Sequence, residues 1–183
     1  MSVRIQPLAI ASAPEGSKLI LEGAQQKMGF IPNLYATFAH NPEVLKSYLA
    51  LGDALSKSGL DPLEQQIVAL TVSRENDCNY CVAAHSAISA MSKLDEKVIA
   101  QVRAGDALSN PKLEALRTFA KRIVSSKGWV DSSDLESFYG AGYTATQGLA
   151  VILGVTMKTL SNYVNHVAGT PLDQAFSPFA WKK

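Results

Sequence analysis

The sequence predicts an all-α domain, and three observations support that prediction. Apolar residues recur at helical spacing through most of the 183 residues, and no stretch alternates β-branched and polar residues as a half-buried strand would. The dipeptides Asn41-Pro42, Asp61-Pro62 and Asn110-Pro111 each place a capping side chain directly before a proline, which is typical of a helix start. No Asn-Gly dipeptide signals a β-hairpin. We therefore expect about eight helices.

The helices are expected to follow one another within a single domain, residues 1–183. Residues 1–14 predict an extended arm, because two prolines interrupt any helix there. Asn33, Asp77 and Asp131 stand where they can cap the helices that follow them. The apolar spacing then predicts helices over residues 17–28, 34–39, 42–58, 62–74, 78–91, 95–103, 111–127, 135–139 and 144–167.

The longest of these helices, residues 144–167, has apolar side chains over much of its circumference. Such a helix is usually buried in the centre of a bundle or in a subunit interface. Gly169 and Pro171 end it. The aromatic residues of the tail, residues 171–183, are expected to pack on the body of the domain.

Composition excludes several classes of function. Apolar residues make up 47% of the chain, enough for a core, and the formal net charge is +1. A near-neutral chain with scattered basic residues has no electrostatic footprint for nucleic acid. The charged fraction of 18% favours burial of part of the surface in a homo-oligomer. With no window apolar enough to span a bilayer and no signal-peptide pattern, we expect a cytoplasmic protein without a membrane partner.

The reactive side chains are concentrated in one stretch, SRENDCNYCVAAHS. It contains the only two cysteines, Cys78 and Cys81, followed by His85, with the spacing C-x2-C-x3-H. On a helix capped by Asp77 these three fall within a stripe of roughly 60°, since successive residues are about 100° apart. The positive end of the helix dipole favours a thiolate, and His85 can take the proton of Cys81 or hold it by a hydrogen bond. The face thus carries a nucleophile, a resolving thiol and a base.

Other roles for this stretch are disfavoured. One alternative is that the cysteines and His85 simply fill the core, but that combination on one face seldom arises by chance. A zinc ion needs ligands around a tetrahedron, whereas these three come from two turns of one helix and no second cysteine pair exists. A thioredoxin fold requires a strand before the cysteines, where a helix is expected. We expect no cofactor and no metal.

The run LDPLEQQIVALTVSRENDCNYCVAAH resembles the core of the AhpD-like alkylhydroperoxidase group within the carboxymuconolactone decarboxylase superfamily. GFIPNLYATFAHNPEVLKSYLALGDAL resembles the segment before that core, and HVAGTPLDQAF resembles a peroxidase-related subset. The resemblance implies an AhpD-like fold, assembly into trimers or hexamers, and reduction of hydroperoxides through a dithiol/disulfide cycle that an external thiol reductant completes. It also implies that Cys81 is the peroxidatic cysteine, Cys78 the resolving cysteine and His85 the family histidine.

Two positions depart from the family pattern. Gln66, twelve residues before Cys78, stands where the family has a proton-relay glutamate, and an amide does not accept a proton at neutral pH. Tyr80 stands where some members have a relay histidine, and its ordinary pKa of about 10 makes it a poor base. The candidate relay residues are Tyr80, Gln66 and Glu75. Because Gln66 and Tyr80 replace the family's proton carriers, weak peroxidase activity is compatible with this set. The alternative is a non-catalytic redox-sensing or disulfide-exchange module of the same fold; a decarboxylase-type enzyme or a metal-binding protein is less favoured.

Overall fold

The computed structural model describes residues 4–183, so the first three residues of the expected arm lie outside the described part of the chain. Within residues 4–183 the chain forms helices and no strand, which confirms the all-α prediction. The nine α-helices described there are α1 (Glu15–Met28), α2 (Asn33–Phe38), α3 (Pro42–Ser56), α4 (Pro62–Glu75), α5 (Asn79–Met91), α6 (Glu96–Ala104), α7 (Pro111–Ser125), α8 (Ser132–Gly140) and α9 (Ala145–Ala168). Two short 3-10 helices, η1 (Ile10–Ser12) and η2 (Gln174–Phe179), lie in the arm and in the tail. No helix of the described residues is long and apolar enough to cross a membrane.

The helix starts follow the capping signals of the sequence in most cases. The side chains of Asn41, Asp61 and Asn110 each accept hydrogen bonds from backbone N–H groups in the first turn of the next helix. Asp131 forms a capping box with Asp134, so α8 begins three residues before the predicted start.

Asn33 is not the cap of α2 that the sequence predicts. It lies in the first turn of α2, and its backbone N–H donates to Oδ1 of Asp173 at 3.0 Å. The next N–H, that of Leu34, donates to the hydroxyl of Tyr80 at 3.2 Å, and this hydroxyl donates to Oδ2 of Asp173 at 2.5 Å. The unpaired N–H groups of α2 are therefore satisfied by side chains from α5 and from the tail, which join these three segments.

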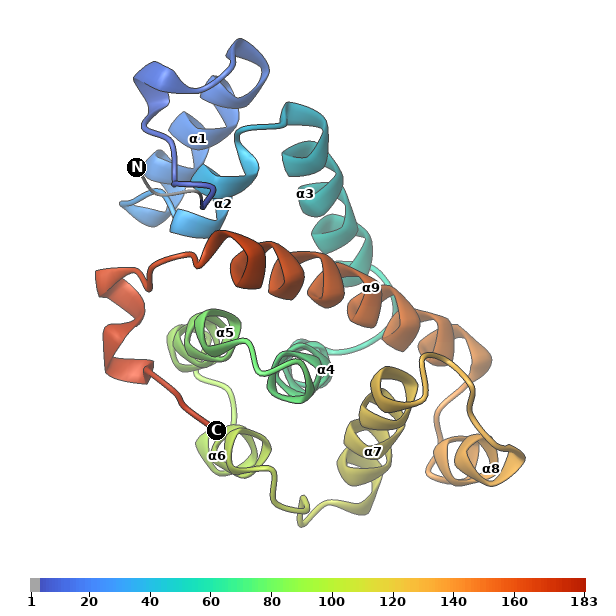
Figure 1. Cartoon of the computed structure of the whole chain (residues 1–183). Helices are drawn as coiled ribbons and strands as arrows, with labels where there is room; N and C mark the ends of the chain where they lie inside the picture. The colour runs from blue at the N-terminus through green and yellow to red at the C-terminus, as the bar shows by residue number, and fades with distance from the viewer. Residues whose placement is uncertain (1–3) are drawn as a thin grey trace.

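Helices α4 and α5 lie at the centre of the molecule (Figure 1). Helix α9 runs between α1–α3 on one side and α4 and α5 on the other, and α6 and α7 lie beyond α4 and α5. One group of buried side chains is centred on α4, α7 and α9 and includes Ile67, Leu116 and Val151. A second group joins α3 to α5 and includes Leu45 and Cys81. The helix that carries the cysteines is therefore enclosed by packed helices.

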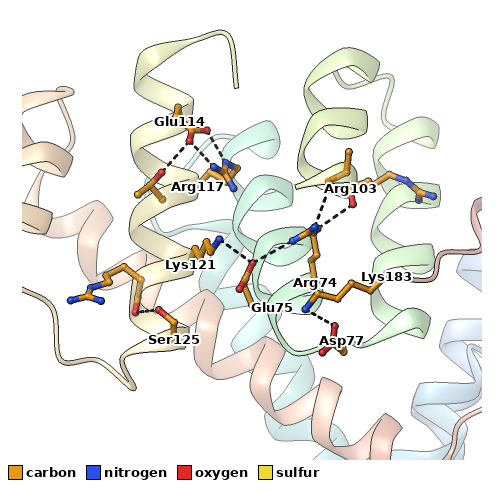
Figure 2. A network of polar contacts seen from close by, with 12 residues as sticks. Arg74, Glu75, Asp77, Arg103, Glu114, Arg117, Lys121, Ser125 and Lys183 are labelled. Atoms are coloured by element: carbon orange, nitrogen blue, oxygen red, sulfur yellow. Dashed lines mark hydrogen bonds and ion pairs between the residues drawn. The ribbon is translucent and has the colours of Figure 1, made fainter. Parts of the chain in front are cut away.

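The break between α4 and α5 is one residue in the left-handed conformation. Asp77 has φ 54°, and the N–H groups of Asp77 and Cys78 donate to the carbonyls of Arg74 and Ser73 at 3.0 and 2.8 Å. This is a Schellman motif, which ends α4. The prediction that Asp77 caps α5 is therefore wrong, because Cys78 occupies the N-cap position. The carboxylate of Asp77 instead pairs with Nζ of Lys183 at 2.8 Å (Figure 2).

The tail, residues 171–183, lies against the centre of the domain. Phe176 is buried, and its ring meets that of Tyr80 edge to face, with 6.0 Å between the centroids. The indole N–H of Trp181 donates to the carbonyl of Arg103 in α6 at 3.1 Å. The tail thus contributes to the wall around α5.

Candidate active site

Both cysteines lie at the start of α5. Cys78 is the N-cap residue and Cys81 lies in the first turn; both are free thiols with 1% of their surface exposed. Their spacing on one turn lets the thiol of Cys78 hydrogen-bond Cys81. Within residues 4–183, no three His, Cys, Asp or Glu side chains are grouped to hold a metal ion.

A stripe of buried polar side chains on α9 faces α5. This α9 polar stripe consists of Lys158, Ser161, Asn162 and Asn165. Its spacing places the side chains on one face of the helix. Nδ2 of Asn165 lies 3.2 Å from Sγ of Cys81 and 3.6 Å from Sγ of Cys78, and Oγ of Ser161 lies 3.7 Å from Sγ of Cys81. Cys81 is therefore surrounded by groups that stabilise a negative charge on sulfur.

His85 is held at both ring nitrogens. Nδ1 lies 2.8 Å from Oε1 of Gln66, and Nε2 lies 2.8 Å from Nζ of Lys158. An amide oxygen only accepts, so Nδ1 carries the proton and Nε2 accepts from Lys158. Burial and the charge of Lys158 lower the pKa of His85 well below its ordinary value. His85 is thus a neutral imidazole that orients Lys158.

The two cysteines have opposite tendencies to ionise. Burial alone would raise the pKa of Cys81, but the hydrogen bond from Cys78, the charge of Lys158 and the bonds from α9 lower this pKa well below its ordinary value. The hydrogen bond to Cys81 and burial raise the pKa of Cys78. The arrangement therefore favours a thiolate at Cys81 beside a thiol at Cys78.

Lys158 is a buried cation, with 1% of its surface exposed. Among residues 4–183 it forms no ion pair with a carboxylate. Burial alone would lower the pKa of its ammonium group, but the negative charge of Cys81 raises this pKa above its ordinary value. A lysine is rarely buried without a partner, and the thiol group that lines the same cavity is that of Cys81.

A cavity of about 140 Å³ adjoins Cys81. Cys81, His85 and Lys158 form its reactive wall, and the remaining wall is mostly apolar and aromatic, including Tyr35 and Met157. Cys78 is not part of the lining. A molecule in this cavity would therefore meet the sulfur of Cys81 first.

The structure brings one of the three candidate relay residues to the histidine. That residue is Gln66, whose amide oxygen accepts from Nδ1. The hydroxyl of Tyr80 is engaged by α2 and the tail, and burial raises the pKa of Tyr80. The carboxylate of Glu75 lies 3.6 Å from Arg74 and 3.9 Å from Lys121 (Figure 2). In the described part of the chain, neither Tyr80 nor Glu75 hydrogen-bonds the histidine or a cysteine.

The contribution of α9 to the site was not predicted from the sequence. This helix was expected to be apolar over much of its circumference, whereas the α9 polar stripe contacts both cysteines and the histidine. The available signal was the spacing of Lys158, Ser161 and Asn165, which places three polar side chains on one face of an otherwise apolar helix.

The sequence model of the carboxymuconolactone decarboxylase family matches residues 42–121. This range runs from α3 to α7 and includes Gln66, both cysteines and His85, while Lys158 lies beyond it. No curated protein matches the chain.

Several solved structures share the whole fold. One is the alkylhydroperoxidase AhpD core of an uncharacterized peroxidase-related protein from Ralstonia eutropha JMP134, with TM-score 0.84, 26% identity, and 96% of this chain and 95% of that chain covered. A peroxidase-related protein from Silicibacter sp. TM1040 has TM-score 0.82 and 21% identity, with 96% and 95% covered. The debrominase Bmp8 in complex with 2,3,4-tribromopyrrole has TM-score 0.81 and 18% identity, with 98% and 96% covered. Residues 42–121 thus resemble the carboxymuconolactone decarboxylase family, and the whole chain shares the fold of the AhpD core and of the peroxidase-related proteins.

Proposed function

We propose that this protein is a thiol-dependent peroxidase that reduces organic hydroperoxides through a Cys78–Cys81 dithiol/disulfide cycle. One observation supports this most directly: Cys81 lines a mostly apolar cavity, and Cys78, one helical turn before it and outside that lining, provides the second thiol. A peroxidatic cysteine needs access to substrate and a thiolate, and a resolving cysteine needs neither before the first step. A cytoplasmic location, where cysteines are kept reduced, suits this cycle.

In the proposed cycle the thiolate of Cys81 attacks the terminal oxygen of the hydroperoxide. A sulfur–oxygen bond forms, the oxygen–oxygen bond breaks, and the leaving alkoxide takes a proton to become the alcohol. Cys78 then displaces the hydroxyl group of the Cys81 sulfenic acid as water, which forms the disulfide. An external dithiol, either a reductant protein or a small thiol, restores both cysteines by disulfide exchange.

Mixing pre-reduced wild-type protein with an alkyl hydroperoxide tests the proposal. We expect one alcohol formed per chain and a Cys78–Cys81 disulfide detected by mass spectrometry of peptides. If the disulfide instead forms and opens only by exchange with other thiols, and no hydroperoxide is consumed, the redox-sensing or disulfide-exchange function replaces the peroxidase.

The size of the cavity predicts the preferred hydroperoxide. A cavity of about 150 Å³ is large enough to hold benzene, and this one has about 140 Å³. We expect tert-butyl hydroperoxide to react about tenfold faster than hydrogen peroxide, because each buried carbon contributes up to about 0.8 kcal/mol. An 18-carbon fatty-acid hydroperoxide should react more slowly than tert-butyl hydroperoxide, and single-turnover rates at equal concentration measure all three. An unchanged rate across the series would contradict this use of the cavity.

Reductive dehalogenation is a second candidate, which the mostly apolar cavity at Cys81 favours. The debrominase Bmp8 shares the fold, and its complex contains a small aromatic ring compound, 2,3,4-tribromopyrrole. Two thiols and a carbon–bromine bond would yield a carbon–hydrogen bond, a disulfide and hydrogen bromide, so the electrons balance. Release of bromide from 2,3,4-tribromopyrrole by pre-reduced protein tests this candidate.

We also propose that the chain forms a homo-oligomer, a trimer or a hexamer. The outer side of α9 carries four exposed apolar side chains, Leu149, Ile152, Tyr163 and Val167, with exposed fractions of 69, 47, 57 and 68%. Their spacing places them along one side of the helix, and a row of this kind is typical of an interaction surface. Sedimentation velocity should show three or six chains per particle, and a monomer at micromolar concentration would contradict the proposal.

A further inference from the structure

Lys158 is a buried cation, and within residues 4–183 only a cysteine is placed to carry the balancing negative charge. The titratable side chains that face it come from three other helices, namely Tyr35 of α2, Tyr48 of α3, and Cys78, Cys81 and His85 of α5. Burial raises the pKa of Tyr35 to about 12 and also raises that of Tyr48, so both hydroxyls stay neutral at physiological pH. His85 is neutral as well, because its Nε2 accepts from Lys158. The remaining candidate for the negative charge is a thiolate.

The surroundings of His85 exclude the usual route for a proton. A carboxylate at position 66 could accept and return a proton, but Gln66 cannot. Tyr80 and Glu75 are engaged elsewhere. Lys158 lines the cavity and contacts His85, and its ammonium group can give up a proton and take it back. It is therefore the group of this site that can supply a proton to a molecule in the cavity.

We propose that Lys158 is the counter-ion of the Cys81 thiolate and the acid that protonates the leaving oxygen. The proposal rests on the proposed peroxidase function and assigns a lysine to the task for which the family pattern has a carboxylate relay. The reduced site holds Cys81 as S⁻, Lys158 as NH₃⁺ and Cys78 as SH.

The proton and electron balance closes without a further group. Two electrons pass from the sulfur of Cys81 to the hydroperoxide as the sulfur–oxygen bond forms and the oxygen–oxygen bond breaks. Lys158 gives its proton to the alkoxide, which leaves an alcohol, a neutral amine and a neutral sulfenic acid. The proton of Cys78 then leaves with the hydroxyl group as water when the disulfide forms. On reduction by a dithiol, Cys81 returns as a thiol and passes its proton back to Lys158, so neither buried charge is ever left unpaired.

The first test measures the ion pair without any peroxide. In a Cys78→Ser background Cys81 is the only cysteine, and the ultraviolet absorbance of its thiolate follows its ionisation. Lys158→Met should raise the midpoint of this titration by at least about one pH unit, a tenfold change in the ionisation constant. Lys97→Met removes an exposed lysine of α6 and should leave the midpoint unchanged. Equal midpoints for Lys158→Met and its parent would overturn the pairing.

The titration of the parent protein, Cys78→Ser, keeps the pairing testable even if Lys158→Met does not fold. Lys158→Met removes one partner of a buried pair, but Cys81 can then take up a proton, so no unpaired buried charge remains and Lys158→Met is expected to fold. If it does not, the Cys78→Ser protein alone still decides, because the pairing requires a midpoint below about 8.5, the ordinary value for a cysteine.

The second test separates proton donation from thiolate stabilisation. Leaving acetate needs no proton, whereas leaving tert-butoxide does, so peroxyacetic acid and tert-butyl hydroperoxide are compared at about pH 9 with wild type and Lys158→Met. We expect Lys158→Met to lose about 10²-fold in rate with the alkyl hydroperoxide and less than about tenfold with the peroxy acid. An equal loss with both substrates would overturn the acid role.

The two proposals can fail separately. If the wild-type protein reduces neither substrate, the peroxidase function fails, and the acid role of Lys158 fails with it. The thiolate titration still decides whether Lys158 is the counter-ion of Cys81.

Discussion

The variant Cys81→Ser is expected to lower the rate of hydroperoxide reduction by about 10⁴-fold, since a serine hydroxyl in the same place is not ionised at neutral pH. Cys81 lines the cavity, its sulfur accepts a hydrogen bond from Nδ2 of Asn165 in α9, and the charge of Lys158 lowers its pKa. No other described nucleophile has these contacts. Single-turnover consumption of tert-butyl hydroperoxide by pre-reduced protein measures the effect.

The variant Cys78→Ser is the matched control, because it removes the other thiol of the same helical turn. It should complete the first step at a rate within about tenfold of wild type and then stop at the Cys81 sulfenic acid, since no resolving thiol remains. Dimedone labels sulfenic acid and should mark Cys81 in this variant alone. If Cys78→Ser loses the first step while Cys81→Ser keeps it, the two cysteines exchange roles, and a loss in neither variant would refute the thiol mechanism.

The local signals of the sequence were sufficient for most of the fold. Asn41, Asp61 and Asn110 cap the helices that they were expected to cap, because a capping side chain and the following proline act within one turn. Asn33 and Asp77 carry the same kind of signal and do not act as caps. The N–H groups of Asn33 and Leu34 in α2 find partners 140 and 46 residues away, and Asp77 takes the left-handed position that ends α4. Local patterns do not reveal such partners or which of two adjacent helices a single residue serves.

The candidate site likewise contains residues that could be predicted from the sequence and residues that could not. The residues that could be predicted, Cys78, Cys81 and His85, lie within two turns of one helix, where spacing determines the shared face. Lys158 could not be placed there from sequence, because it reaches His85 across 73 residues and through the packing of α9 on α4 and α5. The family pattern directed attention to a missing carboxylate at Gln66, and the structure supplies a buried ammonium group beside it instead. Such a partner becomes evident only once the helices are placed in space.

The packing of α9 leads to the largest expected effect on stability, at Gly154. A Cβ at this position would lie 2.8 Å from Cγ1 of Val68 in α4 and 3.7 Å from Cδ1 of Leu55. Gly154→Ala gains up to about 1 kcal/mol from helix propensity but adds a clash that costs about 1–3 kcal/mol, so a net loss of about 1–2 kcal/mol is expected. Gly154→Leu should lose more, about 3–5 kcal/mol, because its side chain must displace α9.

Gly23→Ala is the matched control for this effect. Gly23 lies inside α1, and a Cβ there would meet nothing within 4 Å. This substitution should stabilise the protein by about 0.5–1 kcal/mol, since only the helix propensity changes. Urea unfolding measures the free energy of unfolding for all variants, and a stabilisation by Gly154→Ala equal to that of Gly23→Ala would contradict the close approach of α9 to α4.

The same substitution also tests how the site is built. Gly154 and Lys158 lie one turn apart on the same side of α9, so a shift of α9 away from α4 moves Nζ of Lys158 away from His85 and Cys81. Gly154→Ala should therefore raise the midpoint of the Cys81 thiolate titration as well as lower the stability, although residue 154 contacts neither cysteine. The thiolate depends on a lysine, and the lysine depends on how closely two helices approach, so a single methyl group at their crossing is expected to weaken the fold and the chemistry together.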